Sequence, residues 1–367
     1  MKTQETVLEI DLNNLKHNFE FIKSRLQPQT KILAVVKAFA YGSDAEVIAN
    51  YLQELNVDYL AVAYVSEGIQ LRKAGVHIPI LVLHPQSVNF KLLIDYCLEP
   101  NLYNFRVLND FIAIATDLKQ NNYPVHIKFN TGLNRLGFEA DAIDAITEIT
   151  NSNDIIKVTS IFSHLAASED LNEQDFTQQQ IRLFKKIKTD FNNLSTDKPF
   201  AHLTNTSGIL NYPEAHFDMV RTGIGLYGFG NSKIHSKNLK PIATLKSIIS
   251  QIHTIQKGES LGYNRALIAD KTIKTATIPI GHADGISRQY GNGNGFVYIN
   301  QQKAPIIGNV CMDMIMVDIT EIKCNEGDEV TIYNGSHTAS SFAKSANTIS
   351  YEIITATSRR IKRIIQR

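Results

Sequence analysis

The stretch "KILAVVKAFAYG", residues 31–42, places a lysine directly after the apolar run 32–36. An apolar run this short is typical of a strand that is buried in a parallel sheet. Burying an ammonium group costs free energy unless a partner compensates its charge. Lys37 therefore either reaches solvent from the end of a strand or takes part in a site.

Strand-like and amphipathic runs alternate from about residue 30 to residue 230. The predicted strands cover residues 31–38, 58–65, 78–84, 98–103, 125–130, 156–164, 200–205 and 218–225. Amphipathic stretches such as 43–56 and 172–194 predict helices, and Ser43 and Asp44 suit the N-cap of the first. Eight strands, each with a crossover, are typical of a (β/α)8 barrel. A doubly wound open sheet is the alternative, although no GxGxxG follows the first strand.

The pattern changes after about residue 237, where short strands and turns predict a mainly-β domain. The strand-like stretch 6–12 precedes the barrel pattern and could pair with this domain. Residues 341–367 predict a terminal helix. We therefore expect an N-terminal strand over 1–12 that joins the β domain, a (β/α)8 barrel over 13–237, and a β domain with a terminal helix over 238–367.

The composition is that of an ordinary globular protein, with 367 residues, 43% of them hydrophobic and 20% charged. The net charge of +1 favours neither nucleic acid nor an anionic membrane as a partner. The three cysteines show no CxxC spacing, so we predict no metal site and a reducing compartment. No signal peptide or spanning segment is recognisable, and we expect a soluble cytoplasmic protein.

Several strand ends carry chemically active side chains, and barrel enzymes place catalytic residues at the carboxyl ends of their strands. The candidates are Lys37, Lys128, Arg135, His164, Asn205, Thr206, Ser207, Arg221, Gly223 and Ile224. Taken singly, His164 could be a core histidine and Arg221 an ion-pair partner. The loops after strands seven and eight bind phosphate in many barrels, and here they carry hydroxyl groups and the sequence "TGIG".

A lysine at strand one and a phosphate site at strands seven and eight together suit pyridoxal 5'-phosphate (PLP), bound as a covalent imine. Arg221 would lie near the pyridine ring of this cofactor. Because arginine does not give up its proton at usable pH, it would keep the ring nitrogen unprotonated. Such a ring suits racemisation better than transamination.

Seven blocks of the sequence, in order, resemble those of the alanine racemase family. They are "AVVKAFAYG", "KFNTGLNRLGF", "FSHLAASED", "VRTGIGLYG", "LGYNRALIA", "PIGHADGISR" and "GNVCMDMIMVDIT". The resemblance covers essentially the whole chain. It implies a TIM barrel followed by a mainly-β domain, PLP, and the interconversion of L- and D-alanine for peptidoglycan synthesis. It also implies a homodimer in which the β domain of one chain completes the barrel site of the other.

The resemblance also implies roles for individual residues. Lys37 would bind PLP and act as the base for D-alanine, while Tyr263 would handle the proton of L-alanine on the opposite face. Arg135 would contact the substrate, and Lys128 is similar to a lysine that is often carbamylated. The phosphate positions are Tyr41, Thr206, Gly223 and Ile224, with Asn205 also near the cofactor. His164 and Arg221 would lie below the ring, and Cys311, Met312 and Asp313 would form the loop that receives the substrate carboxylate.

Some positions depart from the commoner family pattern. Asn130 replaces an aspartate, Thr206 a serine, and His282 a tyrosine near the substrate entrance. The C-terminal tyrosine that reaches the phosphate has no clean match, because Arg359 stands near its place and Tyr351 lies upstream. Three alternatives stay open: a barrel decarboxylase with an acidic group for the ring nitrogen, a broad-specificity amino acid racemase, and a non-catalytic carrier barrel without a second domain.

Overall fold

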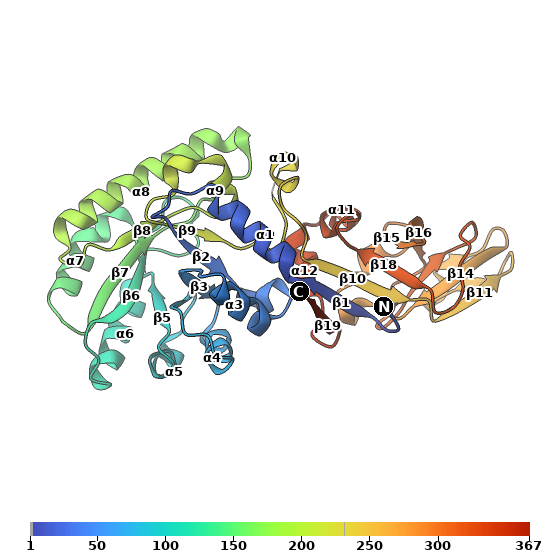
Figure 1. The fold of residues 1–367 in the computed structure, drawn as a ribbon, viewed down its shortest axis with the longest axis horizontal. Coiled ribbons are helices and arrows are strands. Elements are labelled where there is room, and N and C mark those ends of the chain that lie inside the picture. The colour runs from blue at the N-terminus through green and yellow to red at the C-terminus, as the bar shows by residue number, and fades with distance from the viewer. Residues whose placement is uncertain (1–2, 231) are drawn as a thin grey trace.

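The computed structural model describes residues 3–230 and 232–367. The molecule is elongated, with a helix-covered barrel at one end and a β domain at the other (Figure 1). The chain begins in the β domain, passes through the barrel, and returns to the β domain (Figure 1).

Eight parallel strands form a closed barrel, in the order β2-β3-β4-β5-β6-β7-β8-β9. Their bounds are β2 Lys31–Val35, β3 Tyr59–Val62, β4 Ile80–Val82, β5 Glu99–Leu102, β6 Tyr123–Lys128, β7 Ile156–Phe162, β8 Phe200–His202 and β9 Met219–Thr222. The pairing of β9 with β2 closes the barrel, from Lys31 opposite Met219 to Ala34 opposite Thr222. The predicted barrel is confirmed, and the open-sheet alternative is wrong.

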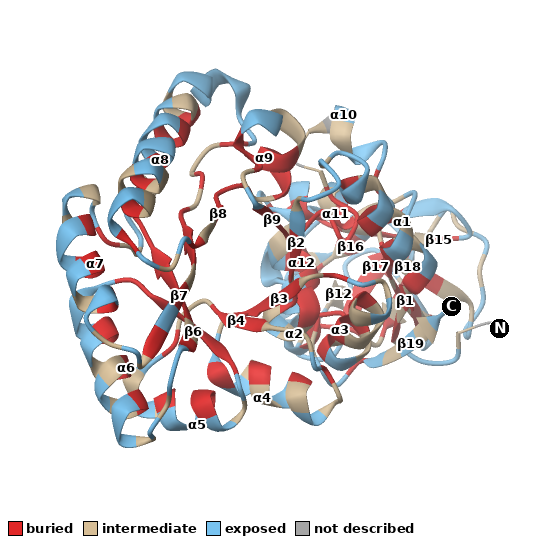
Figure 2. Cartoon of the chain, turned by 60° about the vertical axis from the view of Figure 1, so that its left-hand side comes forward, coloured by how far each residue is buried: buried red, intermediate tan, exposed pale blue. Residues whose placement is uncertain are grey.

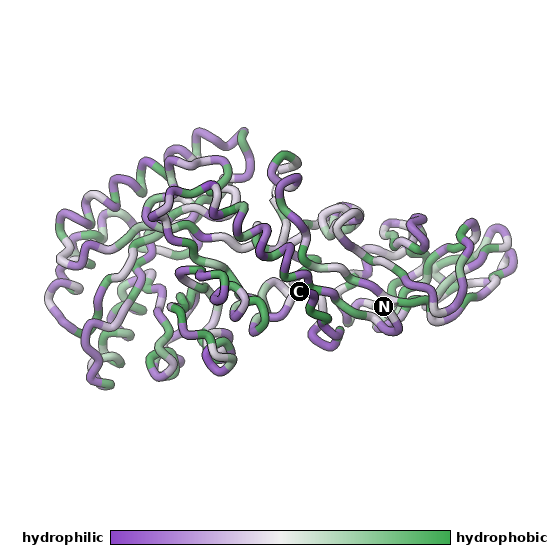
Figure 3. The backbone as a smooth tube through the Cα atoms, in the orientation of Figure 1, coloured by the Kyte–Doolittle hydropathy of each residue, from purple (hydrophilic) through white to green (hydrophobic). Residues whose placement is uncertain are grey.

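Helices cover the outside of the barrel and bury their apolar sides against it (Figure 2). They are α1 Leu12–Lys23, α3 Ala45–Glu54, α4 Val65–Lys73, α5 Phe90–Asp95, α6 Phe105–Asp117, α7 Ile143–Asn151, α8 Gln174–Leu194 and α9 Thr206–Asn211. Two further short segments, α2 Lys37–Tyr41 and α10 Lys233–Ser236, are not part of this outer layer. Asp44 is the N-cap of α3, because its side chain accepts hydrogen bonds from the backbone N–H groups of Glu46 and Val47. Figure 3 shows hydrophilic residues along α8. Within the described part of the chain, no helix combines the length and apolarity needed to cross a bilayer.

A nine-stranded sheet builds the second domain, in the order β11-β14-β17-β16-β15-β18-β10-β1-β19. Its strands are β1 Val7–Asp11, β10 Ala243–Ile248, β11 Gln251–Ile255, β14 Ile273–Ile278, β15 Phe296–Ile299, β16 Gln302–Ile307, β17 Ile315–Asp318, β18 Glu329–Tyr333 and β19 Lys362–Gln366, beside the ribbon of β12 Ser260–Leu261 and β13 Leu267–Ile268. Strand β1 pairs antiparallel with β10 and parallel with β19. The N-terminal strand therefore belongs to the sheet of the second domain.

The predicted terminal helix is wrong for the last residues. The region forms two short helices, α11 Ala339–Lys344 and α12 Ser350–Ala356, and then ends in strand β19. The open edge of β1 supplies backbone partners to residues 362–366, and β-branched isoleucines such as Ile364 and Ile365 fit a pleated strand. Tertiary pairing thus overrides the helical pattern of this basic segment.

The barrel interior divides into an apolar part and a polar part. Leu33, Tyr59, Ala61, Leu81 and Met219 form a separate apolar cluster inside the barrel. Charged and polar side chains from strands β5 to β9 occupy the other part, and all of them are buried: Glu99, His126, Ser160, His202 and Arg221. Buried polar groups of this kind require hydrogen-bond partners.

Candidate active site

A cavity of about 560 Å³ opens at the carboxyl ends of the barrel strands. Ten predicted site residues from the barrel line it: Lys37, Tyr41, Lys128, Arg135, His164, Asn205, Thr206, Arg221, Gly223 and Ile224. They follow or end strands β2, β6, β7, β8 and β9, which the closed barrel brings to one rim. The cavity lining, as far as the structure describes it, contains four cationic side chains and no carboxylate. Such a cavity suits an anionic ligand.

Lys37 is followed by an unusual backbone segment. Residues 38–41 all have φ between 50° and 56°, and Gly42 has φ of 80°. Segment α2 is therefore a left-handed turn, which costs about 1–2 kcal/mol for each residue that is not glycine. This turn lets Lys37 and Tyr41 line the same cavity. Sequence patterns do not reveal it, because they predict right-handed helices and extended strands.

Contacts from two directions hold the left-handed turn. Glu67 accepts hydrogen bonds from the backbone N–H groups of Ala38 (2.6 Å) and Ala63 (2.7 Å), which ties the turn to the end of β3. On the other side, Arg359 lies 4.5 Å from the ring centroid of Phe39. These contacts offset part of the cost of the strained backbone.

Arg221 lies at the floor of the cavity. Its Nη1 donates to Nδ1 of His202 (2.7 Å), and its Nη2 donates to Nδ1 of His164 (3.0 Å) and to the carbonyl oxygens of Ser163 and Leu203. Burial, and then the charge of Arg135, lowers the pKa of Arg221 to about 9. The guanidinium therefore stays charged at neutral pH and presents only donors.

Two lysines, Lys37 and Lys128, also line the cavity. Burial lowers the pKa of Lys37, and the charge of Arg135 lowers it further. Burial, followed by the charges of Arg135 and Arg221, lowers the pKa of Lys128 to about 8. Both lysines thus have a larger neutral fraction near pH 7 than a free lysine. A neutral amine is the form that acts as a nucleophile or base.

Hydroxyl groups and glycines gather at the other end of the cavity. The Thr206 and Thr222 hydroxyl oxygens lie 3.2 Å apart, and the backbone N–H of Gly225 donates to the Thr206 oxygen (3.3 Å). A Cβ at residue 223 would overlap the Tyr41 hydroxyl group. Glycine at this position therefore leaves room for a bound group beside the Tyr41 hydroxyl.

The remaining predicted residues lie in the β domain, away from this cavity. Tyr263, Cys311, Met312 and Asp313 line a pocket of about 470 Å³, and in the described structure it shares no lining residue with the barrel cavity. Tyr263 is 73% exposed and Met312 is 59% exposed. Within one chain, the fold therefore brings Lys37 and Tyr263 to different pockets.

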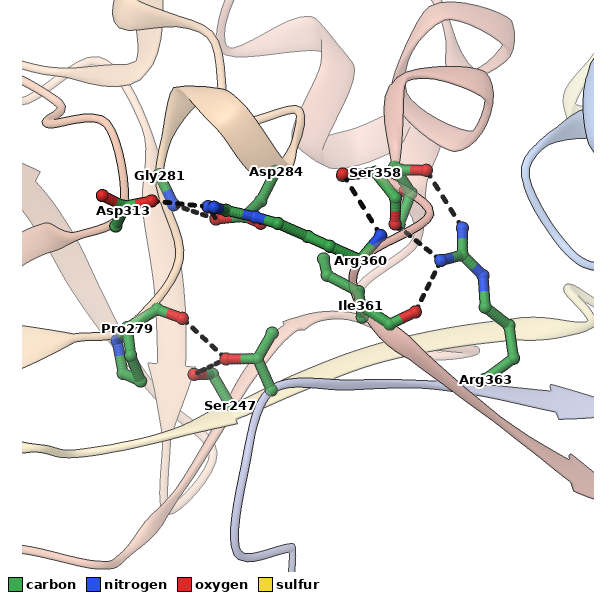
Figure 4. A network of polar contacts seen from close by, with 11 residues as sticks. Ser247, Pro279, Gly281, Asp284, Asp313, Ser358, Arg360, Ile361 and Arg363 are labelled. Carbon is green, nitrogen blue, oxygen red and sulfur yellow. Dashed lines mark hydrogen bonds and ion pairs between the residues drawn. The ribbon is translucent and has the colours of Figure 1, made fainter.

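The loop 311–313 is held by backbone and charged partners. The backbone N–H groups of His282 and Ala283 donate to the carbonyl oxygens of Cys311 (2.9 Å) and Met312 (3.0 Å). Arg360 donates to both Asp284 and Asp313, as Figure 4 shows. Arg360 joins the tail to this loop, a role that sequence patterns did not reveal.

Two family models match almost the entire chain. The model of the alanine racemase N-terminal domain matches residues 10–230, and that of the C-terminal domain matches residues 242–365. The chain belongs to the alanine racemase family.

Individual relatives agree with this assignment. A curated alanine racemase of Thermodesulfovibrio yellowstonii is 36% identical over 97% of this chain and 96% of its own. The alanine racemase structure of Clostridium difficile has a TM-score of 0.92 and 32% identity, over 99% of this chain and 96% of its own. That of Bartonella henselae, which contains covalently bound pyridoxal phosphate, has a TM-score of 0.90 and 28% identity, over 99% of this chain and 100% of its own.

Asn130, which replaces the aspartate of the commoner family pattern, has a structural role. Its Oδ1 accepts from the backbone N–H groups of Gly132 and Asn134, and its amide nitrogen donates to the Glu139 carboxylate (2.9 Å). An aspartate could accept the same backbone bonds, but it would repel Glu139. Asn130 thus shapes the turn that leads to Arg135.

Further positions that differ from the commoner family pattern lie in the C-terminal tail and in the β domain. Tyr351 lines the barrel cavity, with its ring 6.1 Å from that of Tyr41, whereas Arg359 packs on Phe39. Tyr351 is therefore the tail tyrosine at the cavity. His282 is exposed in the β domain. Arg221, not a carboxylate, lies at the cavity floor, which argues against a barrel decarboxylase.

Proposed function

We propose that this protein interconverts L-alanine and D-alanine with PLP as its cofactor, and so supplies D-alanine for peptidoglycan synthesis. The observation that supports this most directly is the cavity in which Lys37, Arg221 and the glycine- and hydroxyl-lined end face one space. A phosphorylated aldehyde needs an amine, a phosphate site and a partner for its ring, and these residues fit all three.

Each part of the cofactor has a matching group in this chain. Lys37 would hold the aldehyde carbon, and Arg221 with His164 would lie at the ring. Tyr41, Thr206, Gly223 and Ile224 would hold the phosphate, with Asn205 and Tyr351 alongside. When bound, PLP stabilises the negative charge that remains on Cα after its proton leaves. Arg221 would donate to the ring nitrogen and keep it unprotonated, which restricts this stabilisation to what racemisation requires.

Two bases on opposite faces of Cα would move the proton. Lys37 Nζ would take or give it on one face, and the hydroxyl group of Tyr263 on the other. The lowered pKa of Lys37 favours its neutral form, which is the form that accepts the proton. When one base takes the proton from its face of Cα, the other base would deliver a proton to the opposite face, so the configuration inverts.

The substrate carboxylate would be received by Arg135 and by the backbone N–H of Met312, with Cys311 and Asp313 in the same loop. Lys128 would be carbamylated: its neutral amine adds CO₂, an N–C bond forms, and a proton is released to water. The product is an anion beside Arg135, in place of a cation. The pKa of Lys128, lowered to about 8, favours the neutral amine that this addition needs.

A homodimer would complete the site. Tyr263 and Met312 are exposed in their own chain. A groove of about 1,070 Å³ runs beside the barrel cavity and shares four lining residues with it: Arg135, His164, Asn205 and Tyr351. We propose that the β domain of a second copy enters this groove and brings its Tyr263 opposite Lys37. The arrangement is reciprocal, as expected of a twofold dimer.

Absorbance and activity test the function. The purified protein should be yellow, borohydride should fix the cofactor on Lys37, and L- and D-alanine should interconvert, with serine as the comparison substrate. A colourless protein that leaves alanine unchanged would contradict the proposal.

Subunit mixing tests the dimer. Lys37→Ala and Tyr263→Phe chains are each expected to be nearly inactive. After mixing and exchange, half of the dimers would be mixed and carry one intact site, which restores about a quarter of the wild-type activity. Activity that stays at the level of the separate variants would mean that each chain completes its own site.

A further inference from the structure

A continuous chain of hydrogen bonds crosses the polar half of the barrel interior. It joins one residue from each of five neighbouring strands: Arg221 on β9, His202 on β8, Ser160 on β7, His126 on β6 and Glu99 on β5. The distances are 2.7 Å from Arg221 Nη1 to His202 Nδ1, 3.0 Å from His202 Nε2 to Ser160 Oγ, 2.6 Å from Ser160 Oγ to His126 Nδ1, and 2.6 Å from His126 Nε2 to Glu99 Oε2. We call this set the relay.

With neutral histidine rings and an ionised Glu99, the two ends of the relay set one direction for its protons. Arginine has donors and no acceptor, so Nδ1 of His202 must accept and its proton must lie on Nε2. Ser160 then accepts from His202 and donates its own proton to Nδ1 of His126. The proton of His126 lies on Nε2 and is donated to Glu99. The positions of these hydrogens follow from the donors and acceptors at the two ends.

The carboxylate end and the burial of the relay support the same direction of its hydrogen bonds. A carboxylate only accepts hydrogen bonds, so Glu99 requires a proton on Nε2 of His126. This is the same direction that follows from the donors of Arg221 at the other end. His126, Ser160 and His202 have no exposed surface, and Glu99 and Arg221 are 8% and 5% exposed. Burial, and then the charge of Arg221, also lowers the pKa of His202, in keeping with a neutral ring. Water therefore does not compete for these bonds.

We propose that the relay positions Arg221 for the cofactor ring, with Glu99 as its remote counter-charge and Ser160 as the link between them. This inference rests on the cofactor site of the proposed function.

The physical effect passes through His202. A histidine that donates one ring N–H to an acceptor becomes a stronger acceptor at its other nitrogen, as is known for metal-bound histidines. Chains of such bonds polarise one another in a low-dielectric interior. Ser160 and Glu99 thus strengthen the acceptor that holds Nη1 of Arg221, although neither residue lines the cavity.

The first measurement is the position of the protons. NMR of ¹⁵N-histidine-labelled protein, with and without PLP, should show Nδ1 unprotonated and Nε2 protonated on both His126 and His202. A proton on Nδ1 of either ring would overturn the direction of the relay. Because the apoprotein is measured as well, this result does not depend on whether PLP binds.

The second measurement is PLP affinity of the apoprotein, followed by absorbance. Ser160→Ala removes one oxygen from the middle of the relay and should weaken PLP binding about tenfold, the low end of the range for outer partners of ligating groups. Ser247→Ala is the matched control, because Ser247 is also fully buried in a strand but lies in the β domain. It should bind PLP as the wild type does.

Glu99→Gln provides a second variant in case Ser160→Ala does not fold. It keeps an acceptor for His126 and removes the counter-charge, so PLP affinity should again fall. Wild-type affinity in both variants would overturn the relay. A wild-type protein that does not bind PLP at all would instead overturn the proposed function.

Discussion

Arg363 donates a hydrogen bond from Nη2 to the carbonyl oxygen of Gly42, 2.7 Å away, although 321 positions separate the two residues. Gly42 ends the left-handed turn that begins after Lys37. Arg363 also donates to the carbonyl oxygens of Thr357, Ser358 and Ile361. The C-terminal tail therefore fastens the β domain to the segment that presents Lys37.

Replacing Arg363 should loosen this fastening. In Arg363→Met, four carbonyl oxygens lose a charged donor, and we expect the free energy of unfolding to fall by about 2 kcal/mol. Urea unfolding of the purified protein measures the change. Arg367→Met is the control, since Arg367 makes a 3.7 Å surface contact with Glu54, and it should stay within about 0.5 kcal/mol of the wild type. Equal stability of the two variants would contradict the role of Arg363.

Gly42→Ala should lower the free energy of unfolding more than Arg363→Met does. The new Cβ would overlap the carbonyl oxygen of Ile354 in α12, at a residue with φ of 80°, so we expect a loss of about 3–5 kcal/mol. Gly75→Ala is the matched control, because Gly75 also has positive φ but has no atom within 4 Å of the added Cβ. Its cost should be the backbone strain alone, about 1–2 kcal/mol. Thermal unfolding compares the two, and a larger loss at Gly75 would contradict the packing argument.

The lowered pKa of Lys128 predicts a pH dependence of stability in the apoprotein. This pKa is about 8 in the folded protein, against 10.5 for an unperturbed lysine, so between these values the unfolded chain binds more protons. The free energy of unfolding therefore increases with pH across that range, by at most about 1.4 kcal/mol per pH unit. As pH falls toward 8 this contribution is lost, because the buried amine must then be protonated in the folded protein.

The measurement compares wild type, Lys128→Met and the exposed-site control Lys157→Met by urea unfolding between pH 7.5 and 9.5, in CO₂-free buffer. The advantage of Lys128→Met over the wild type should shrink as pH rises, whereas Lys157→Met should follow the wild-type curve. An advantage that grows with pH has the wrong sign and would rule out a lowered pKa.

Arg360→Met should affect substrate binding more than turnover. The change removes the ion pair between Asp313 and the tail and frees the loop that carries Met312. We expect KM for alanine to rise about tenfold with a smaller change in kcat, as for the loss of an outer partner of a binding group. Lys362→Met, two residues along the tail and paired with Glu5 at the surface, should leave KM unchanged. Steady-state kinetics in both directions distinguish the two results.

The barrel was predictable from the sequence because short, mostly apolar runs alternate with amphipathic stretches along the chain. All eight runs correspond to barrel strands, from 31–38 for β2 to 218–225 for β9. The end of the chain was not predictable in this way. Residues 362–366 become strand β19 because β1 offers an edge, and a distant edge leaves no local signal.

Part of the site was predictable from the sequence, and part of it was not. Four site residues lie at the carboxyl ends of barrel strands or directly after them: Lys37, Lys128, His164 and Arg221. Barrel closure alone therefore predicts that they share one cavity. Glu99, His126, Ser160 and His202 look like ordinary strand residues in the sequence. They become a relay only because adjacent strands place their inward side chains at hydrogen-bond distance.

The sequence by itself determined the eight barrel strands, ten of the cavity residues and the family, because these depend on residue type and spacing along the chain. Only the tertiary structure decided the left-handed turn after Lys37, the hydrogen bond from Arg363 to Gly42, and the separation of Tyr263 from Lys37. The turn and the hydrogen bond from Arg363 depend on contacts between segments that are far apart in the chain, and the free energy of these contacts outweighs the local backbone preference.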